Sequence, residues 1–174
     1  MRTREETEEL VAKCTVHNNY EIAGFFNEYR WLSNHYLVPI QTGPVGLSLI
    51  FPSNEHAFMY RKLGVEDKNY VEYKKIIEMT SAQVKAWGKT IKLRPDWDKV
   101  KKKIMFDINY SKFAQHPDLK EKLLATGKKN LEERNYFKDS YWGTAESWND
   151  MNYKFEFAGQ NWLGKILMMV RDLV

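Results

Sequence analysis

The segment FPSNEHAFMYRK, residues 51–62, constrains the fold most, because it contains the start of a helix and a patterned helix face. Ser53 is a favourable N-cap, and the carboxylate of Glu55 then lies at the positive end of the helix dipole. Residues 55, 58, 59 and 62 share one face, because their spacings are three, four and seven. At 1.5 Å per residue, Glu55 and Lys62 lie roughly 10 Å apart, with Phe58 between them. That span suits a small ligand with a reacting centre at one end and an anionic group at the other. The competing interpretation is a solvated edge of a core-facing helix.

Length and composition are those of an ordinary globular domain. The chain has 174 residues, of which 43% are apolar and 29% are charged, so it is long enough for one domain with its own core. Aromatic residues are plentiful, with ten Tyr, nine Phe and six Trp. We expect most of them in the core, although aromatic rings also serve as stacking surfaces for bases and sugars.

The sequence argues against several classes of protein. The single cysteine, Cys14, excludes an internal disulfide and favours a reducing, cytoplasmic location. Without a cysteine pair, a structural zinc site is not expected, and we predict no metal. The N-terminus lacks the apolar segment of a signal peptide, and no apolar run is long enough to span a membrane. The net charge of +4 permits an anionic partner but does not require one.

The first half of the chain predicts a leader followed by a hairpin and helices. Residues 1–19 form a charged N-terminal leader, and residues 20–174 form the domain. The ranges 36–41 and 46–51 are predicted strands of a hairpin around the turn at 42–44. The helix beginning near Ser53 should end by Gly64.

The second half predicts mainly helices. A helix over 69–79 precedes a capping box at Thr80–Gln83, which opens a short helix ending at Gly88. After Pro95 a long helix should bury the stripe Val100, Ile104, Met105 and Ile108. The next helix begins at 116–118 and ends at 126–127. A long polar loop is expected over 143–160. Asn161 should then cap a final helix that buries Leu163, Ile166, Leu167 and Val170. The fold class is therefore α+β, predominantly helical, with a small antiparallel β element.

Six segments together resemble one known family. They are Asn27-Glu28-Tyr29-Arg30-Trp31-Leu32-Ser33-Asn34, Pro52-Ser53-Asn54-Glu55-His56 with Lys62, Leu93-Arg94-Pro95-Asp96-Trp97-Asp98, Leu123-Leu124-Ala125-Thr126-Gly127, Tyr141-Trp142-Gly143, and Gly159-Gln160-Asn161-Trp162-Leu163-Gly164-Lys165 continuing to Val170-Arg171. Each segment is weak alone, but their order and spacing are similar to those of the NADAR family, the YbiA-like N-glycosidases. The resemblance runs from about Phe25 to the C-terminus.

The resemblance implies hydrolysis of an N-glycosidic bond between a ribose and a nitrogen base or an amine. The implied substrates are phosphorylated ribosylaminopyrimidines of riboflavin biosynthesis, or ADP-ribose attached to guanine in nucleic acid. Neither reaction requires a metal or redox cofactor, so no cofactor is expected. The expected partner is the ribosylated or ADP-ribosylated substrate, as a small molecule or as modified nucleic acid.

The resemblance also implies the site residues. The predicted catalytic residues are Glu55, Lys62 and Trp142; the predicted substrate-binding residues are Arg30, Ser33, Asn34, Phe58, Trp97, Asp139 and Asn161. A carboxylate at position 55 would stabilise the oxocarbenium-like charge at C1′, activate water or form a covalent intermediate. Trp97 and Trp142 would stack on a base. Lys62 and Arg30 would hold a phosphate.

Each role has a structural alternative. Glu55 could serve only as a first-turn dipole partner, the two tryptophans as core anchors, and the two cations as surface charges. Ser33 and Asn34 suit ribose hydroxyls but equally a turn cap. His56 is predicted to be structural, because neighbouring helical residues point about 100° apart.

One position departs from the family pattern. Family members often follow Tyr-Trp-Gly with Asp-Gly, whereas Thr144 occupies the Asp position here, and the acids Glu146, Asp150 and Glu156 follow. The chain could therefore act on a different substrate class or use one of these acids. A catalytically silent module that binds ADP-ribose or a nucleotide is the alternative function. A basic nucleic-acid adaptor is a third, supported by composition alone.

Overall fold

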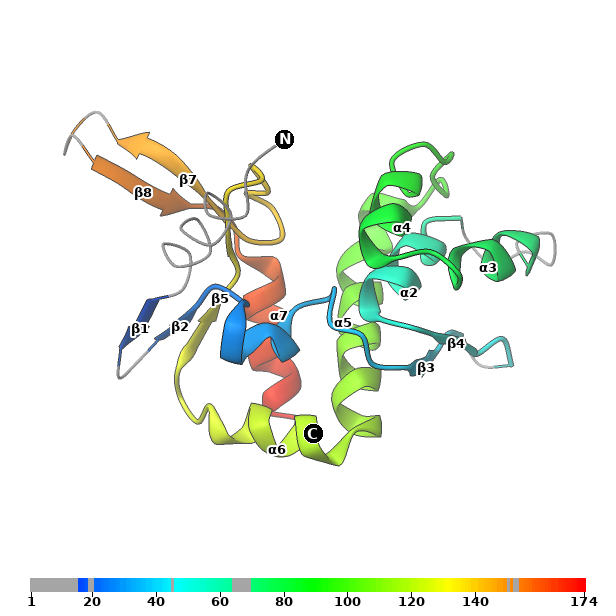
Figure 1. The fold of residues 1–174 in the computed structure, drawn as a ribbon, viewed down its shortest axis with the longest axis horizontal. Coiled ribbons are helices and arrows are strands. Elements are labelled where there is room, and N and C mark those ends of the chain that lie inside the picture. The colour runs from blue at the N-terminus through cyan, green and yellow to red at the C-terminus, as the bar shows by residue number, and fades with distance from the viewer. Residues whose placement is uncertain (1–15, 19–20, 45, 64–69, 150, 152–153) are drawn as a thin grey trace. The chain divides into compact units, whose positions relative to one another are not determined.

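The computed structural model describes residues 16–18, 21–44, 46–63, 70–149, 151 and 154–174 (Figure 1). Contacts within the chain divide it into two compact units. The first unit comprises Met1–Ser33 with Lys122–Leu173, and the second comprises Asn34–Glu121 with Val174.

The second unit consists of a small hairpin and helices. Its elements are β3 (Ile40–Thr42), β4 (Leu49–Phe51), α2 (Asn54–Arg61), α3 (Tyr70–Ile76), α4 (Ser81–Trp87), α5 (Trp97–Gln115) and the start of α6 (Pro117–Ala125). α2 packs against both α4 and α5. Every residue of α2 from Asn54 to Tyr60 is buried, so this helix is the centre of the unit.

The predicted hairpin is confirmed, although its strands in the structure are shorter than the predicted ranges. β3 and β4 pair antiparallel, with Ile40 opposite Phe51. α5 holds the backbone of β3 through Gln115, whose amide accepts from the Gln41 N–H at 2.8 Å and donates to the Gln41 carbonyl at 2.7 Å. The Tyr73 hydroxyl of α3 donates to the carbonyl of Ile50 in β4. Both strands are therefore fastened to helices that surround α2.

The helix signals of the second unit are confirmed. Thr80 and Gln83 form the predicted capping box at the start of α4. The predicted stripe of α5 is buried at Ile104, Met105 and Ile108, whereas Val100 is half-buried. His116 ends α5, and α6 begins at Pro117.

The first unit holds two small sheets and the C-terminal helix α7 (Trp162–Arg171). One sheet has the order β1 (Val16–Asn18), β2 (Glu21–Ala23), β5 (Asn130–Glu132), and β2 pairs parallel with β5. The other has the order β6 (Arg134–Asn135), β7 (Thr144–Asn149), β8 (Lys154–Ala158), and β6 pairs parallel with β7. α7 buries the four predicted apolar residues and packs on β5.

The long polar loop predicted over 143–160 is wrong. Two antiparallel strands, β7 and β8, occupy most of it, with Glu146 opposite Phe157 and Ser147 opposite Glu156 (Figure 1). The interpretation failed because the polar residues of β7 show no alternation with period two, although charged residues and phenylalanines do alternate in β8. Phe157 marks the covered side, since it makes an edge-to-face contact with Tyr136 at 5.7 Å.

The fold class is confirmed as predominantly helical α+β. The β content is larger than the single antiparallel element predicted, because the described residues form three small sheets that include two parallel pairings. Of the predicted leader, residues 16–18 form β1, while 1–15 and 19 lie outside the described residues.

Candidate active site

Glu55 is held at the first turn of α2 by its backbone. Its N–H donates to the carbonyl of Asn34 at 2.9 Å, and its side chain is only 6% exposed. Ser53 occupies the predicted N-cap position, but its hydroxyl does not cap the helix. That hydroxyl lies 2.7 Å from Nδ1 of His56 instead. Side-chain capping by Ser53 was therefore predicted wrongly, and the 34–55 backbone bond takes over part of that role.

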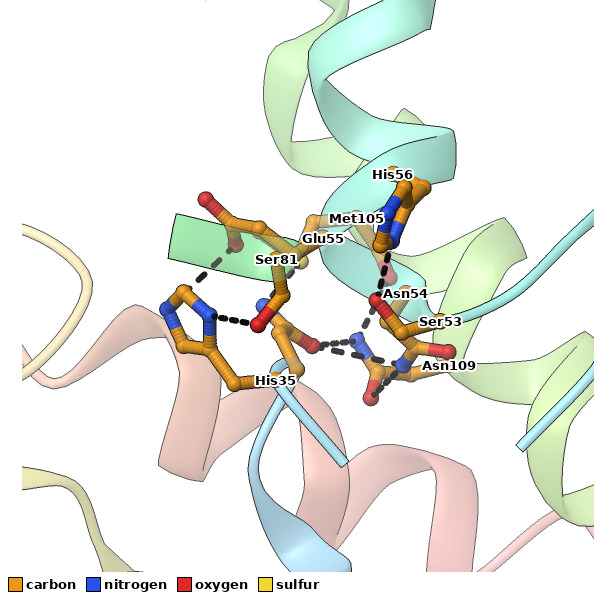
Figure 2. Close-up of polar contacts among 9 residues, drawn as sticks. His35, Ser53, Asn54, Glu55, His56, Ser81, Met105 and Asn109 are labelled. Atoms are coloured by element: carbon orange, nitrogen blue, oxygen red, sulfur yellow. Dashed lines mark hydrogen bonds and ion pairs between the residues drawn. The ribbon is translucent and has the colours of Figure 1, made fainter. Parts of the chain in front are cut away.

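Below Glu55, three buried asparagines join separate parts of the second unit. Asn54 donates to Asn109 Oδ1 at 2.9 Å and to Asn34 Oδ1 at 3.3 Å. Asn109 donates to the carbonyl of Met105 at 3.0 Å, and Asn34 donates to the sulfur of Met105 at 3.2 Å (Figure 2). All three amides are at most 6% exposed. This asparagine cluster ties the segment at 34, the start of α2 and the middle of α5 into one rigid support for Glu55.

The structure adds His35 and Ser81 to the site, which sequence reasoning missed. His35 Nε2 lies 4.0 Å from Glu55 Oε2, and His35 Nδ1 lies 3.0 Å from the hydroxyl of Ser81 (Figure 2). His35 directly follows the Ser33-Asn34 pair. That adjacency was the only sequence signal for it, since residue 35 lies in an irregular segment without periodicity.

An aromatic wall stands on the same face of α2. Phe58 packs against Trp97 with ring centroids 5.1 Å apart and planes inclined by 51°. Both residues are buried, at 3% and 8% exposure. The Lys62 ammonium lies 6.0 Å from the centre of the Trp97 ring and donates to the carbonyl of Gly88 at 3.2 Å. The solvated-edge interpretation of this face is therefore wrong.

The pKa of Lys62 is lowered from its ordinary value. Burial is the largest cause, because it penalises the charged form, and the positive charges of Lys85 and Lys89 act in the same direction. The negative charge of Glu55 opposes them and raises the pKa of Lys62. Glu55 and Lys62 are thus electrostatically coupled, as the helical spacing predicts. A lysine with a lowered pKa is a stronger acid than an exposed lysine.

The segment Arg94–Trp97 is fixed to the end of α2 and positions Trp97. The N–H of Arg94 donates to the Lys62 carbonyl at 2.8 Å, which docks the segment on the end of α2. The Arg94 guanidinium also donates two hydrogen bonds to the Asp96 carboxylate, which lower the pKa of that carboxyl. The turn delivers Trp97 as the first residue of α5, directly onto Phe58.

His56 is structural, as predicted. It is fully buried, and its Nε2 lies 2.9 Å from the carbonyl of Met79, on the opposite ring side from its contact with Ser53. Burial lowers the pKa of His56, while the bond to Met79 opposes that shift. Burial therefore favours the neutral ring, and the two bonds fasten the residues before α4 to α2.

In the first unit, Asp139 organises the segment that carries Trp142. Its Oδ1 accepts from the N–H of Trp142 at 2.9 Å and from the N–H of Tyr141 at 3.2 Å. Trp142 is half-buried and meets Tyr141 edge-to-face at 5.0 Å. The next residue must be glycine, because a Cβ at Gly143 would collide with the carbonyl oxygen of Glu133.

Asn161 also fastens the backbone of the first unit. Its amide donates to the carbonyl of Leu131 at 2.9 Å and accepts from the N–H of Glu133 at 3.1 Å. It occupies the N-cap position of α7 with a φ of 51°, but makes no side-chain cap bond to the helix. The predicted cap through its side chain is therefore wrong. Asparagine tolerates this left-handed conformation better than most residues.

Thr144, at the position where family members often have Asp, makes a local contact between strands. Thr144 is buried, and its hydroxyl donates to Glu132 at 2.8 Å, so it links β7 to β5. Glu146 lies on β7 and Glu156 on β8, whereas Asp150 lies outside the described residues. In the same unit, Arg30 is exposed in the last turn of the 3-10 helix η1 (Asn27–Leu32).

The structure brings half of the predicted set together in the second unit. That group is Asn34, Glu55, Phe58, Lys62 and Trp97. The other predicted residues belong to the first unit; they are Arg30, Ser33, Asp139, Trp142 and Asn161. The roles of all ten remain predictions.

Comparison with known proteins decides the family. The model of the NADAR domain matches residues 21–174. The chain belongs to the NADAR family. The N-glycosidase YbiA of Escherichia coli strain K12 is 27% identical over 172 residues, which cover 99% of this chain and 96% of YbiA. An NMR structure of E. coli YbiA superposes with a TM-score of 0.67 at 26% identity, covering 94% of this chain and 89% of that one.

Two further relatives of this NADAR chain match over shorter regions. An N-glycosidase of Nostoc punctiforme is 43% identical over 83 residues, so this chain spans 47% of that protein. A riboflavin biosynthesis protein of Vibrio vulnificus is 32% identical over 124 residues, which are 70% of this chain and 30% of that protein. Within the described residues, no helix is long and apolar enough to cross a membrane, and no three His, Cys, Asp or Glu side chains gather to hold a metal ion.

Proposed function

We propose that this NADAR enzyme cleaves the bond between a ribose C1′ and a base nitrogen, either on ADP-ribosylated guanine in nucleic acid or on a phosphorylated ribosylaminopyrimidine of riboflavin biosynthesis. Its class, hydrolase acting on N-glycosyl compounds, follows from the family and from relatives named N-glycosidases. The substrate and the residue roles are the proposal. The observation that carries them is a buried carboxylate, Glu55, on the same helix face as an aromatic wall and a cation.

Glu55 suits the electrostatic demand of this reaction. Breaking a ribosyl C–N bond spreads positive charge over C1′ and the ring oxygen, as in glycoside hydrolysis. A carboxylate held in a water-poor site stabilises that charge more than one in bulk water. The backbone bond to Asn34 and the asparagine cluster hold Glu55 in place before substrate arrives. Such preorganisation is what transition-state stabilisation requires.

Phe58, Trp97 and Lys62 suit the rest of the substrate. Trp97 is the ring proposed to stack on the base, and it is held against Phe58 with ring centroids 5.1 Å apart. Lys62 carries either of two roles. As an ammonium it holds a phosphate, and because its pKa is lowered it is also suited to donate a proton to the departing base.

The two substrate classes have different support. The relative from Vibrio vulnificus is named a riboflavin biosynthesis protein, which favours the ribosylaminopyrimidine. The net charge of +4 favours the nucleic-acid substrate slightly, since phosphates attract cations at long range. We therefore keep both classes.

The second candidate function is a silent binding module for ADP-ribose or a nucleotide. Its support is Thr144, which occupies the position of a frequent family aspartate and whose hydroxyl donates to Glu132. A hydroxyl cannot supply the negative charge of a carboxylate. If that charge is needed for turnover, the site would bind without cleaving.

The test is to incubate the purified chain with DNA carrying ADP-ribosylated guanosine and, separately, with a ribosylaminopyrimidine phosphate. Mass spectrometry follows the free base, and calorimetry follows binding of each compound. We expect release of free base from at least one of the two. Binding of either compound without release over hours would instead establish the silent module.

A further inference from the structure

His35 and Ser81 form a chain of contacts that ends on Glu55. The hydroxyl of Ser81, the first residue of α4, lies 3.0 Å from His35 Nδ1. The other ring nitrogen, Nε2, lies 4.0 Å from Glu55 Oε2. The His35 side chain is 34% exposed, whereas that of Glu55 is 6% exposed. A partly exposed imidazole thus lies beside the buried carboxylate.

The direction of the Ser81 bond decides what His35 presents to Glu55. If the Ser81 O–H donates to Nδ1, a neutral ring carries its proton on Nε2, and that N–H faces the carboxylate. A protonated ring carries protons on both nitrogens and adds a positive charge. In either state His35 then favours the ionised form of Glu55.

We propose that Ser81 and His35 are positioning residues that keep Glu55 ionised and aimed during the reaction. This inference rests on the proposed function, in which the negative charge of Glu55 stabilises positive charge at C1′. Ser81 selects the tautomer of His35, and His35 presents its Nε2 proton to Glu55. Neither residue has to touch the substrate for this role.

Other charges act on Glu55 and on Lys62. On α2, Lys62 is coupled to Glu55, and Lys85 of α4 together with Lys89 acts on Lys62 in turn. α5 contributes uncharged side chains to the cluster, Met105 and Asn109. His56 is next in sequence but bonds to Ser53 and Met79 on another side of α2. Lys62 also favours an ionised Glu55, so removal of His35 should weaken the effect rather than abolish it.

The first test is the pH profile of kcat/KM for base release. In His35→Phe the carboxylate loses the imidazole 4.0 Å away, so Glu55 should take up its proton at higher pH. The acidic limb of the profile should move up by about one pH unit, the lower end of the effect of a charge at this distance. His35→Gln supplies an amide N–H and should keep the limb near that of the wild type. Ser81→Ala should move the acidic limb to higher pH by less than His35→Phe does. His116→Phe is the matched control, because that histidine bonds to Pro39 instead.

The second test needs no turnover. NMR follows the ring protons of His35 through a pH titration in the wild type and in Glu55→Gln. Because the coupling is reciprocal, loss of the carboxylate should make His35 release its proton about one pH unit lower. Circular dichroism confirms that the wild type and Glu55→Gln are both folded.

The outcomes separate the two proposals. Coincident titrations of His35 in the wild type and Glu55→Gln, or an unmoved acidic limb in His35→Phe, would overturn the positioning role. A shifted NMR titration without base release from either substrate would leave the coupling established and refute the proposed function instead.

Discussion

The backbone and the side chain of Glu55 are held by different parts of the second unit. The N–H bonds to Asn34, while the carboxylate faces His35 and is coupled to Lys62. Helical spacing predicted the neighbours on α2, since positions three, four and seven apart share a face. It could not predict His35, because an irregular segment has no period that indicates where its side chains point.

At the same scale, Trp97 is expected to bind the base rather than act in the chemical step. Trp97→Phe removes part of the stacking surface and keeps the contact with Phe58. Stacking is worth about 1–3 kcal/mol per base, so KM should rise several-fold while kcat changes little. Steady-state kinetics on the productive substrate measure both constants.

Trp87→Phe in α4 is the control, since it makes the same change elsewhere in the second unit. An unchanged KM in Trp97→Phe would assign Trp97 to core packing alone. Trp97→Ala is less informative, because loss of a large buried ring typically costs about 3–5 kcal/mol of stability.

Among the elements, those with strong local signals were predicted well. The Thr80–Gln83 capping box opens α4, and the apolar period identifies α5. β7 and β8 were missed because the sequence of β7 does not alternate, and the short alternation of β8 was read as part of a polar loop. The partners of Ser53 and Asn161 were also missed, since a polar side chain at a helix start has tertiary partners as well as the helix itself.

The junction of α2 and α5 should depend on Asn109. Asn109→Ala removes the acceptor for Asn54 and leaves buried amides with fewer partners. Each unsatisfied buried group costs about 1–3 kcal/mol, so the free energy of unfolding should fall by about 2–4 kcal/mol. Urea denaturation measures the change.

Lys103→Ala on the same helix is the control for the Asn109 variant. It breaks only an exposed ion pair with Asp107, and such pairs are worth about 0–1 kcal/mol. If Asn109→Ala lost no more stability than this control, the asparagine cluster would not be a structural support.

For the whole molecule, the sequence predicted the class of fold but not how distant segments pair. β2 pairs in parallel with β5, although the two strands are more than a hundred residues apart in the sequence. Such contacts are set by the global packing and have no local signature. The asparagine cluster is a similar case, because Asn34, Asn54 and Asn109 are separated by whole elements.

The stability of the whole chain should depend on pH through Lys112. This residue is fully buried on α5 beside the rings of Tyr36 and Phe113, and burial lowers its pKa to about 7. The unfolded lysine has an ordinary pKa of about 10.4, so between pH 7 and 10 the unfolded chain binds more protons. The Lys112 contribution to stability therefore rises with pH in that window.

Lys112→Met tests this dependence. The variant removes the buried amine and keeps most of the volume, so it should be more stable than the wild type at pH 7. Its advantage should shrink by about 2 kcal/mol between pH 7 and pH 9. Urea denaturation of both proteins at the two pH values measures the difference, and a constant difference would show that Lys112 is protonated alike in the folded and unfolded states.

In the proposed function, the carboxylate of Glu55 drives cleavage of the ribosyl C–N bond. The most direct measurement is the single-turnover rate of base release by Glu55→Gln, with Glu72→Gln of α3 as the control and circular dichroism to confirm folding. We predict a loss on the order of 10²–10³-fold for Glu55→Gln, typical for removal of a preorganised electrostatic group, and an unchanged rate for the control. A folded Glu55→Gln variant that releases base at the wild-type rate would contradict the account.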